Sequence, residues 1–164
     1  MSQALSASTS SDNDAKADQI AHKFFNKFAL LVADARATQP VLTPRPRLDK
    51  WFNLETAETD QFRDALRSYR ALSSSSPAPA PFVVNVVLAV PELSNGEVVV
   101  FTGDDGQRVP LRPTPEGILL EQWTLAFAPA TTSSEVVPLS TVYKHAIATF
   151  RSLYALLRVL PAWK

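Results

Sequence analysis

The chain has 164 residues, of which 46% are hydrophobic and 20% are charged, and its 16 basic and 16 acidic residues cancel to a formal net charge of zero. The length suits one domain with a buried core, and the charge balance argues against nucleic acid as a partner. The absence of cysteine excludes disulfides and thiolate metal sites, and two histidines and four glycines leave little material for a metal centre or a phosphate-binding loop.

Residues 1–16 are rich in serine, alanine and aspartate. They have neither a basic start nor an apolar stretch, so they are not a secretory signal, and we expect a disordered tail. Residues 17–164 are expected to form the domain. No run of about 18 apolar residues occurs, so we expect no transmembrane segment.

The first predicted helix runs from about Asp14 to Ala37, and Asp12 or Asp14 is a candidate N-cap. Apolar side chains recur at intervals of three or four residues and form one stripe: Ile20, Phe24, Phe28, Leu31 and Ala35. The polar positions between them are interpreted as the solvated face of the helix: His22, Lys23, Asn26 and Lys27.

A short extended segment, residues 50–55, follows the first proline cluster and carries two aromatic residues. A second helix is predicted from about Thr59 to Leu72, with Thr59 as its N-cap and with an apolar stripe of Phe62, Leu66 and Tyr69. Residues 73–81, rich in serine and proline, read as a linker.

Beyond the linker the pattern changes to strands, predicted over residues 82–90, 97–102, 107–111 and 117–127. Turn signals at Ser94-Asn95-Gly96 and Asp104-Asp105-Gly106 separate them. The first strand is almost uninterrupted in apolar residues, which is typical of a central strand covered on both faces. Since helices can cover one face, the other would need further chain or a partner subunit.

The last helix is predicted from about Ser140 to Leu160, and Pro161 ends it. Its apolar stripe is wide and comprises Tyr143, Ile147, Phe150, Leu153, Tyr154 and Leu157. The expected fold class is therefore α+β, with three helices packed on one face of a mainly antiparallel sheet.

No motif of a known catalytic class is present, and we expect no enzyme activity, no catalytic residue, no cofactor and no metal site. Asp104-Asp105-Gly106 could form half of a metal site, but a hairpin turn explains it fully. His22 and His145 each stand beside a lysine, which is typical of surface histidines.

The last helix also carries a basic strip, because Lys144, Arg151 and Arg158 are spaced by seven residues. Such a strip could bind an anion, a phosphopeptide or a lipid headgroup, or it could be a solvated face. Arg45, Arg47 and Lys50 form a second basic cluster. Residues 150–163 also have the composition of an interfacial membrane helix, although a core helix needs the same stripe.

Several motifs together resemble the N-terminal HORMA domain of the autophagy-related protein 13 family. They are Lys50-Trp-Phe-Asn-Leu-Glu-Thr56, Leu119-Leu-Glu-Gln-Trp-Thr-Leu125, Leu139-Ser-Thr-Val-Tyr-Lys-His-Ala-Ile147, Phe150-Arg-Ser-Leu-Tyr154 and Leu160-Pro-Ala-Trp-Lys164. The positions matching the family motifs, expected to be structural, are Trp51, Phe52, Asn53, Leu54, Glu121, Trp123, Tyr143, Lys144, Arg151, Tyr154, Pro161 and Trp163. The family often has arginine where Gln122 stands, so an ion pair at that position is in doubt.

The resemblance implies a non-catalytic adaptor, the regulatory subunit of the autophagy-initiation kinase complex, in the cytoplasm and at the preautophagosomal structure. The implied partners are that kinase complex, a second HORMA-fold autophagy protein, the autophagy lipid-kinase complex and the multispanning autophagy vesicle protein. An anion or phosphopeptide sensor using the basic strip is the alternative. Since the family fold continues past its last long helix, the resemblance also predicts a domain that lacks its C-terminal belt strands.

Overall fold

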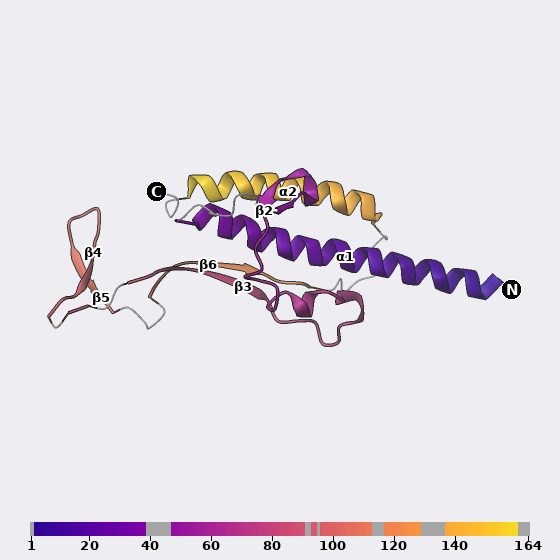
Figure 1. Ribbon diagram of the computed structural model, residues 1–164, viewed down its shortest axis with the longest axis horizontal. Helices are drawn as coiled ribbons and strands as arrows, with labels where there is room; N and C mark the ends of the chain where they lie inside the picture. The colour runs from indigo at the N-terminus through magenta and orange to yellow at the C-terminus, as the bar shows by residue number, and fades with distance from the viewer. Residues whose placement is uncertain are drawn as a thin grey trace. The chain divides into compact units, whose positions relative to one another are not determined.

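The computed structural model describes residues 2–38, 47–90, 93–94, 96–112, 117–128 and 137–160, with side chains from residue 12 onward (Figure 1). The chain divides into two compact units. One comprises Met1–Val83 and Thr124–Lys164, and the other comprises Val84–Trp123.

The first helix, α1, spans Ser2–Arg36, so it begins earlier than the predicted start near Asp14. Alanine favours helix, and neither glycine nor proline occurs before residue 40, so nothing in the early sequence ends the helix. Asp12 and Asp14 therefore lie inside α1 and cannot cap it. The boundary at residue 17 stays a prediction. The predicted stripe is largely confirmed, because Phe28, Leu31 and Ala35 are buried.

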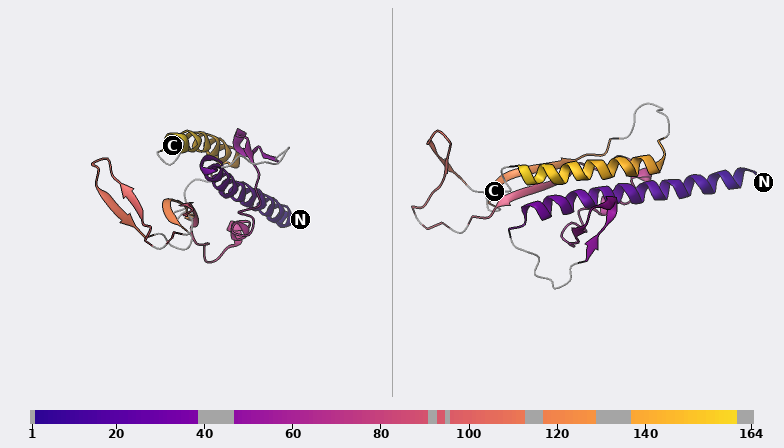
Figure 2. Two further views of the ribbon diagram at one scale, coloured as in Figure 1. Left: turned by 60° about the vertical axis from the view of Figure 1, so that its left-hand side comes forward. Right: turned by 90° about the horizontal axis from the view of Figure 1, so that it is seen from above.

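The last helix, α2, spans Leu139–Val159, which confirms the predicted helix over 140–160. It lies beside α1 in every view of Figures 1 and 2. Phe150 and Leu157 are fully buried, and the ring of Phe150 lies 4.5 Å from that of Phe24 on α1, centroid to centroid. Arg36 Nη1 donates a hydrogen bond of 2.8 Å to the Leu157 carbonyl. The two helices therefore share one apolar interface. No helix among the described residues combines the length and hydrophobicity that crossing a membrane requires.

The predicted helix over 59–72 is wrong. This stretch consists of turns and two short 3-10 segments, η2 over Arg67–Tyr69 and η3 over Leu72–Ser74. Its apolar side chains are nevertheless the predicted ones, since Leu66 and Tyr69 are buried. Tyr69 stacks on Phe25 with 4.3 Å between ring centroids, and its hydroxyl donates to the Ala80 carbonyl at 2.6 Å. These long-range contacts outweigh a weak helical propensity.

The described strands form three two-stranded sheets rather than one sheet under three helices. In the first sheet, β1 (Leu48–Asp49) pairs with β2 (Thr56–Ala57). In the second, β3 (Phe82–Leu88) pairs with β6 (Ile118–Leu125). In the third, β4 (Val99–Thr102) pairs with β5 (Arg108–Leu111). The mixed α+β class is confirmed, but the expected three-helix layer is not.

Within the described chain, the first long strand is covered on one face only, so cover of its other face by further chain or by a partner subunit stays a prediction. Phe82 and Val84 are buried, whereas Val83, Val87 and Leu88 are 43%, 38% and 49% exposed. Apart from Asn85 the strand is apolar, yet its first residues alternate between buried and exposed as those of a half-buried strand do.

The prediction that Asp104-Asp105-Gly106 forms a hairpin turn is confirmed. Gly106 N donates to the Gly103 carbonyl at 2.9 Å, and Gly106 has a φ of 76°, which favours glycine. Asp105 Oδ1 accepts from Gln107 N at 3.0 Å, so that carboxylate holds the turn together. The described residues contain no group of acidic and histidine side chains arranged to hold a metal ion.

Gly117, immediately before β6, offers a test of the β3–β6 pairing. Its φ is 117°, and a Cβ placed there would lie 2.3 Å from the Leu88 carbonyl oxygen. We expect Gly117→Ala to lower the free energy of unfolding by about 1–3 kcal/mol, measured by urea denaturation. Gly96→Ala is the matched control, because Gly96 also has a positive φ, of 95°, but nothing lies within 4 Å of its added Cβ. Equal losses in the two variants would contradict a steric origin.

Candidate functional site

The site is organised by Lys27, an α1 side chain that is completely buried. Its Nζ donates to the Asp49 carbonyl at 3.1 Å, to the Leu54 carbonyl at 2.7 Å and to Thr56 Oγ1 at 3.0 Å. It also forms an ion pair with the Asp49 carboxylate. One ammonium thus gathers β1, β2 and the segment between them onto α1.

The prediction that Lys27 lies on a solvated helix face is wrong. A buried cation is tolerated when it is paired and all its donors are used, and Lys27 meets both conditions. Sequence reasoning missed this residue and its partners Asp49 and Thr56. The signal was present, since Lys27 stands three residues after Phe24 and four before Leu31, within the apolar stripe.

Asp49 is 2% exposed, and its two carboxylate oxygens differ in their surroundings. Oδ1 pairs with Lys27 and also accepts from Trp51 N at 3.2 Å. Oδ2 is buried and has no hydrogen-bond partner in the described part of the chain. Buried polar atoms are normally hydrogen-bonded, so Asp49 Oδ2 is an exception among the described residues.

The turn after Asp49 holds two residues in the left-handed region. Phe52 has φ 59° and ψ 32°, and Asn53 has φ 51°. A bulky residue there costs about 1–3 kcal/mol, which the surroundings must offset. Phe52 N donates to the Tyr143 hydroxyl at 3.0 Å, and the buried Phe52 ring lies 5.0 Å from the ring centroids of both Tyr143 and Phe150.

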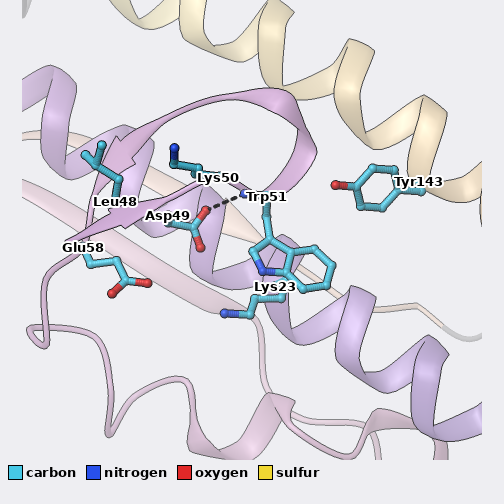
Figure 3. Close-up of a pocket in the computed structure, with 7 residues that line it drawn as sticks. All are labelled: Lys23, Leu48, Asp49, Lys50, Trp51, Glu58 and Tyr143. Carbon is cyan, nitrogen blue, oxygen red and sulfur yellow. Dashed lines mark hydrogen bonds between the residues drawn. The ribbon is translucent and has the colours of Figure 1, made fainter.

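An open groove of about 340 Å³ lies beside this turn (Figure 3). Its lining comes from α1, from β1 with the following turn, from the segment after β2 and from α2: Lys23, Leu48, Asp49, Lys50, Trp51, Glu58 and Tyr143. The Trp51 indole stands between Lys23 and Tyr143, with the Lys23 ammonium 5.5 Å from its ring centroid. The groove is therefore a charged rim around two half-buried aromatic side chains, Trp51 and Tyr143.

The carboxylates and ammonium groups of this groove are not equally engaged. Lys50 Nζ lies 3.1 Å from Glu55 Oε1 in an exposed ion pair. The side chain of Glu58 has no partner among the described residues, although its backbone N donates to the Arg47 carbonyl at 2.8 Å. Of the two carboxylates at the groove, that of Asp49 is therefore buried and paired through one oxygen, whereas that of Glu58 is exposed.

His22 lies on α1 next to Lys23 and is half-buried. Burial lowers the pKa of His22 below its ordinary value, and the charges of Arg70 and Lys23 lower it further. The neutral imidazole is therefore the form that the fold favours.

The three side chains of the basic strip on α2 are not equally accessible to a ligand. Lys144 and Arg151 are exposed, whereas the Arg158 guanidinium stacks 3.4 Å above the Tyr154 ring and donates to Asp34 Oδ2 at 3.4 Å. This stacking is typical of an arginine whose side chain covers apolar surface. An anion-binding role for the strip stays a prediction. In the second basic cluster, Arg45 lies outside the described residues, Arg47 is exposed and Lys50 pairs with Glu55.

The motif positions lie in several parts of the chain, and those of the basic strip and its neighbour, Lys144, Arg151 and Tyr154, are on α2. Trp51, Phe52, Asn53 and Leu54 form the turn at the groove, and Tyr143 joins them from α2. Trp123 Nε1 on β6 donates to Glu121 Oε2 at 2.9 Å, away from that turn in sequence. Pro161 and Trp163 lie outside the described residues. Gln122 makes an amide pair instead of an ion pair, with Nε2 donating to Asn85 Oδ1 at 3.1 Å.

Comparisons of the chain with family models and with other proteins agree on one family. A family model described as Autophagy-related protein 13 matches residues 21–164. Proteins named Autophagy-related protein 13 are 32% identical to the chain over 179 residues in Gibberella zeae, 30% over 172 in Emericella nidulans and 29% over 177 in Yarrowia lipolytica. These alignments cover 93%, 91% and 98% of this chain but only 19%, 18% and 25% of the relatives. No solved structure matches the chain.

Because Lys27 and Asp49 form a buried ion pair, we expect a large loss in the free energy of unfolding when one partner is removed. Lys27→Met leaves the Asp49 carboxylate buried without its cation, so we expect a loss of about 3–5 kcal/mol in the free energy of unfolding, measured by urea denaturation. Lys50→Met, which breaks the exposed pair with Glu55, is the control and should cost less than about 1 kcal/mol. Similar losses in both variants would show that Lys27 does not organise the turn.

The lowered pKa of His22 predicts a pH dependence of stability. The unfolded chain, with its ordinary pKa of 6.5, binds a proton more readily than the folded chain. The contribution of neutral His22 is therefore complete above that value and is lost as the pH falls below it. We expect the free energy of unfolding to fall between pH 7.5 and 5.5, and His22→Gln to flatten this slope. His145→Gln is the exposed control, and an unchanged slope in His22→Gln would contradict the assignment.

Proposed function

Because the chain belongs to the autophagy-related protein 13 family, we propose that it acts in autophagy as a non-catalytic interaction domain of the autophagy-initiation kinase complex. The observation that carries this proposal is the family match over residues 21–164, which includes both sides of the groove. The chain spans at most a quarter of the length of the relatives described above, so it corresponds to one region of a longer protein in them.

The proposal includes a HORMA-type arrangement for the domain. Its support is the order of elements along the chain: a long helix, the Trp-Phe-Asn-Leu-Glu segment, several strands and a second long helix that packs back on the first. Under this proposal, α1 and α2 form the rigid part, because their shared interface contains the fully buried residues Phe150 and Leu157.

We place partner binding at the surface around the groove. Trp51 is half-buried there, and such an aromatic ring beside charged side chains is typical of positions that dominate binding energy in protein interfaces. The strained turn that carries Trp51 is held by contacts from α1 and α2, so the ring is presented in one orientation before a partner arrives.

The proposed partners are the other subunits of the initiation kinase complex, a second HORMA-fold autophagy protein, the autophagy lipid-kinase complex and the multispanning autophagy vesicle protein. Recruitment of these proteins would place the chain at the preautophagosomal structure. The proposal requires no catalytic group in this chain, since its contribution is to hold partners together.

A chimera tests the proposal directly. The region of the Gibberella zeae protein that aligns with this chain is replaced by residues 1–164 in a strain lacking its own copy. We expect restored delivery of a fluorescent cytosolic reporter to the vacuole during starvation. A chimera without residues 1–164 is the negative control. Normal accumulation of the full chimera with no delivery of the reporter would contradict the proposed role.

A further inference from the structure

The hairpin formed by β4 and β5 has one entirely apolar face. Strand pairing places Val99 opposite Leu111 and Phe101 opposite Val109, so these four side chains share a face of the two-stranded sheet. Phe101 is 58% exposed and Val109 is 47% exposed. A two-stranded hairpin alone is only marginally stable in water, and a third strand or a packed helix is what stabilises such a unit.

The hydrogen-bond register of the hairpin determines which backbone groups point outward. Gly103 N donates to the Gln107 carbonyl at 2.9 Å, so these two residues bond across the hairpin. In an antiparallel pair, bonded and non-bonded positions alternate, and residues at the non-bonded positions direct their N–H and C=O away from the neighbouring strand. The outward-pointing positions are therefore the even-numbered pairs of the ladder: Thr102 with Arg108, and Val100 with Pro110.

The two outer edges of the hairpin are not equivalent. On β4, Val100 and Thr102 each present an N–H and a C=O, and among the strands that the structure describes only β5 pairs with β4. On β5, Pro110 has no N–H to present, and proline at such a position is typical of an edge that is not extended. A further strand can therefore add to the hairpin at β4 rather than at β5.

The charges beside β4 describe the strand that fits this edge. Glu97 lies two residues before β4, Asp104 and Asp105 follow it, and all three are exposed. A two-fold pairing of β4 with a second copy of the chain would run antiparallel and would bring Glu97 of one copy to the acidic turn of the other. Like charges across strands are unfavourable. A strand with basic residues at its two ends meets opposite charge instead.

We propose that the outer edge of β4 binds an extended segment of a partner protein, with apolar residues at alternate positions and a lysine or arginine at each end. Main-chain hydrogen bonds to Val100 and Thr102 extend the hairpin to three strands, and the apolar side chains continue the face around Phe101. The basic ends lie beside Glu97 and Asp104. This inference goes beyond the proposed function, because the hairpin contributes no residue to the groove.

The test is a titration of the isotope-labelled chain with the peptide acetyl-KVTVTVK-amide, followed by NMR and by amide hydrogen exchange. We expect saturable shifts and slower exchange at the outward-pointing amides of Val100 and Thr102. The same peptide with N-methyl groups on its five central residues should not bind, because it lacks the main-chain donors. Absence of shifts with the first peptide, or equal binding of the two peptides, would overturn the proposal.

A pair of variants then assigns the edge. Thr102→Pro removes an outward N–H from β4, and Arg108→Pro is the matched control, because it removes the outward N–H opposite, from β5. We expect Thr102→Pro to abolish binding and Arg108→Pro to leave it unchanged. Slow exchange of the Gly103 amide checks that the hairpin forms in both variants. Unchanged binding in Thr102→Pro, or loss of binding in Arg108→Pro with an intact hairpin, would contradict the site.

Two further comparisons identify the occupant. The peptide acetyl-EVTVTVE-amide should bind about ten-fold more weakly than the lysine peptide, because its ends repel Glu97 and Asp104. Equal binding of these two peptides would overturn the assignment of basic ends. Without any peptide, exchange at Val100 that slows as the protein concentration rises would show instead that a second copy of the chain occupies the edge, and the partner assignment would then be wrong.

Discussion

The structure around the groove depends on one buried ammonium. Lys27 is the point at which α1 meets the residues from Asp49 to Thr56, and it is held by two carbonyls, a hydroxyl and a carboxylate. A cation in this position cannot be left unpaired, so the turn must stay where its acceptors meet the ammonium. That requirement places Trp51 at the surface, and it fixes which carboxylate oxygen of Asp49 is occupied.

The same requirement explains why a strained turn persists. Left-handed backbone at Phe52 and Asn53 is unfavourable for residues with side chains. It is maintained because Leu54 is tied to α1 on one side and Phe52 N to α2 on the other. The Phe52 ring then fills the space between the helices, against Phe24 and Phe150. Strain in the backbone is thus offset by burial of the ring, and the two helices determine the orientation of Trp51.

The sequence predicts some of these features and hides others for physical reasons. The helix over 139–159 is readable because a long amphipathic stripe is a local signal. The stretch 59–72 has similar spacing, but Tyr69 contacts Phe25 and Ala80, which are distant in sequence, and those contacts decide its conformation. Lys27 and Asp49 are typical surface residues until they meet each other, so the groove could not be predicted from either one alone.

The resemblance in the Trp-Phe-Asn-Leu-Glu segment therefore acquires a physical meaning. Phe52 and Leu54 serve the fold, since one fills the core and the other supplies a carbonyl to Lys27. Trp51, in contrast, lines the groove at the surface of the protein. Lys23 on α1 and Glu58 after β2 lie outside this motif and also line the groove, with the Lys23 ammonium 5.5 Å from the Trp51 ring centroid. The core thus fixes the orientation of Trp51, while the charged side chains around it come from other elements of the chain.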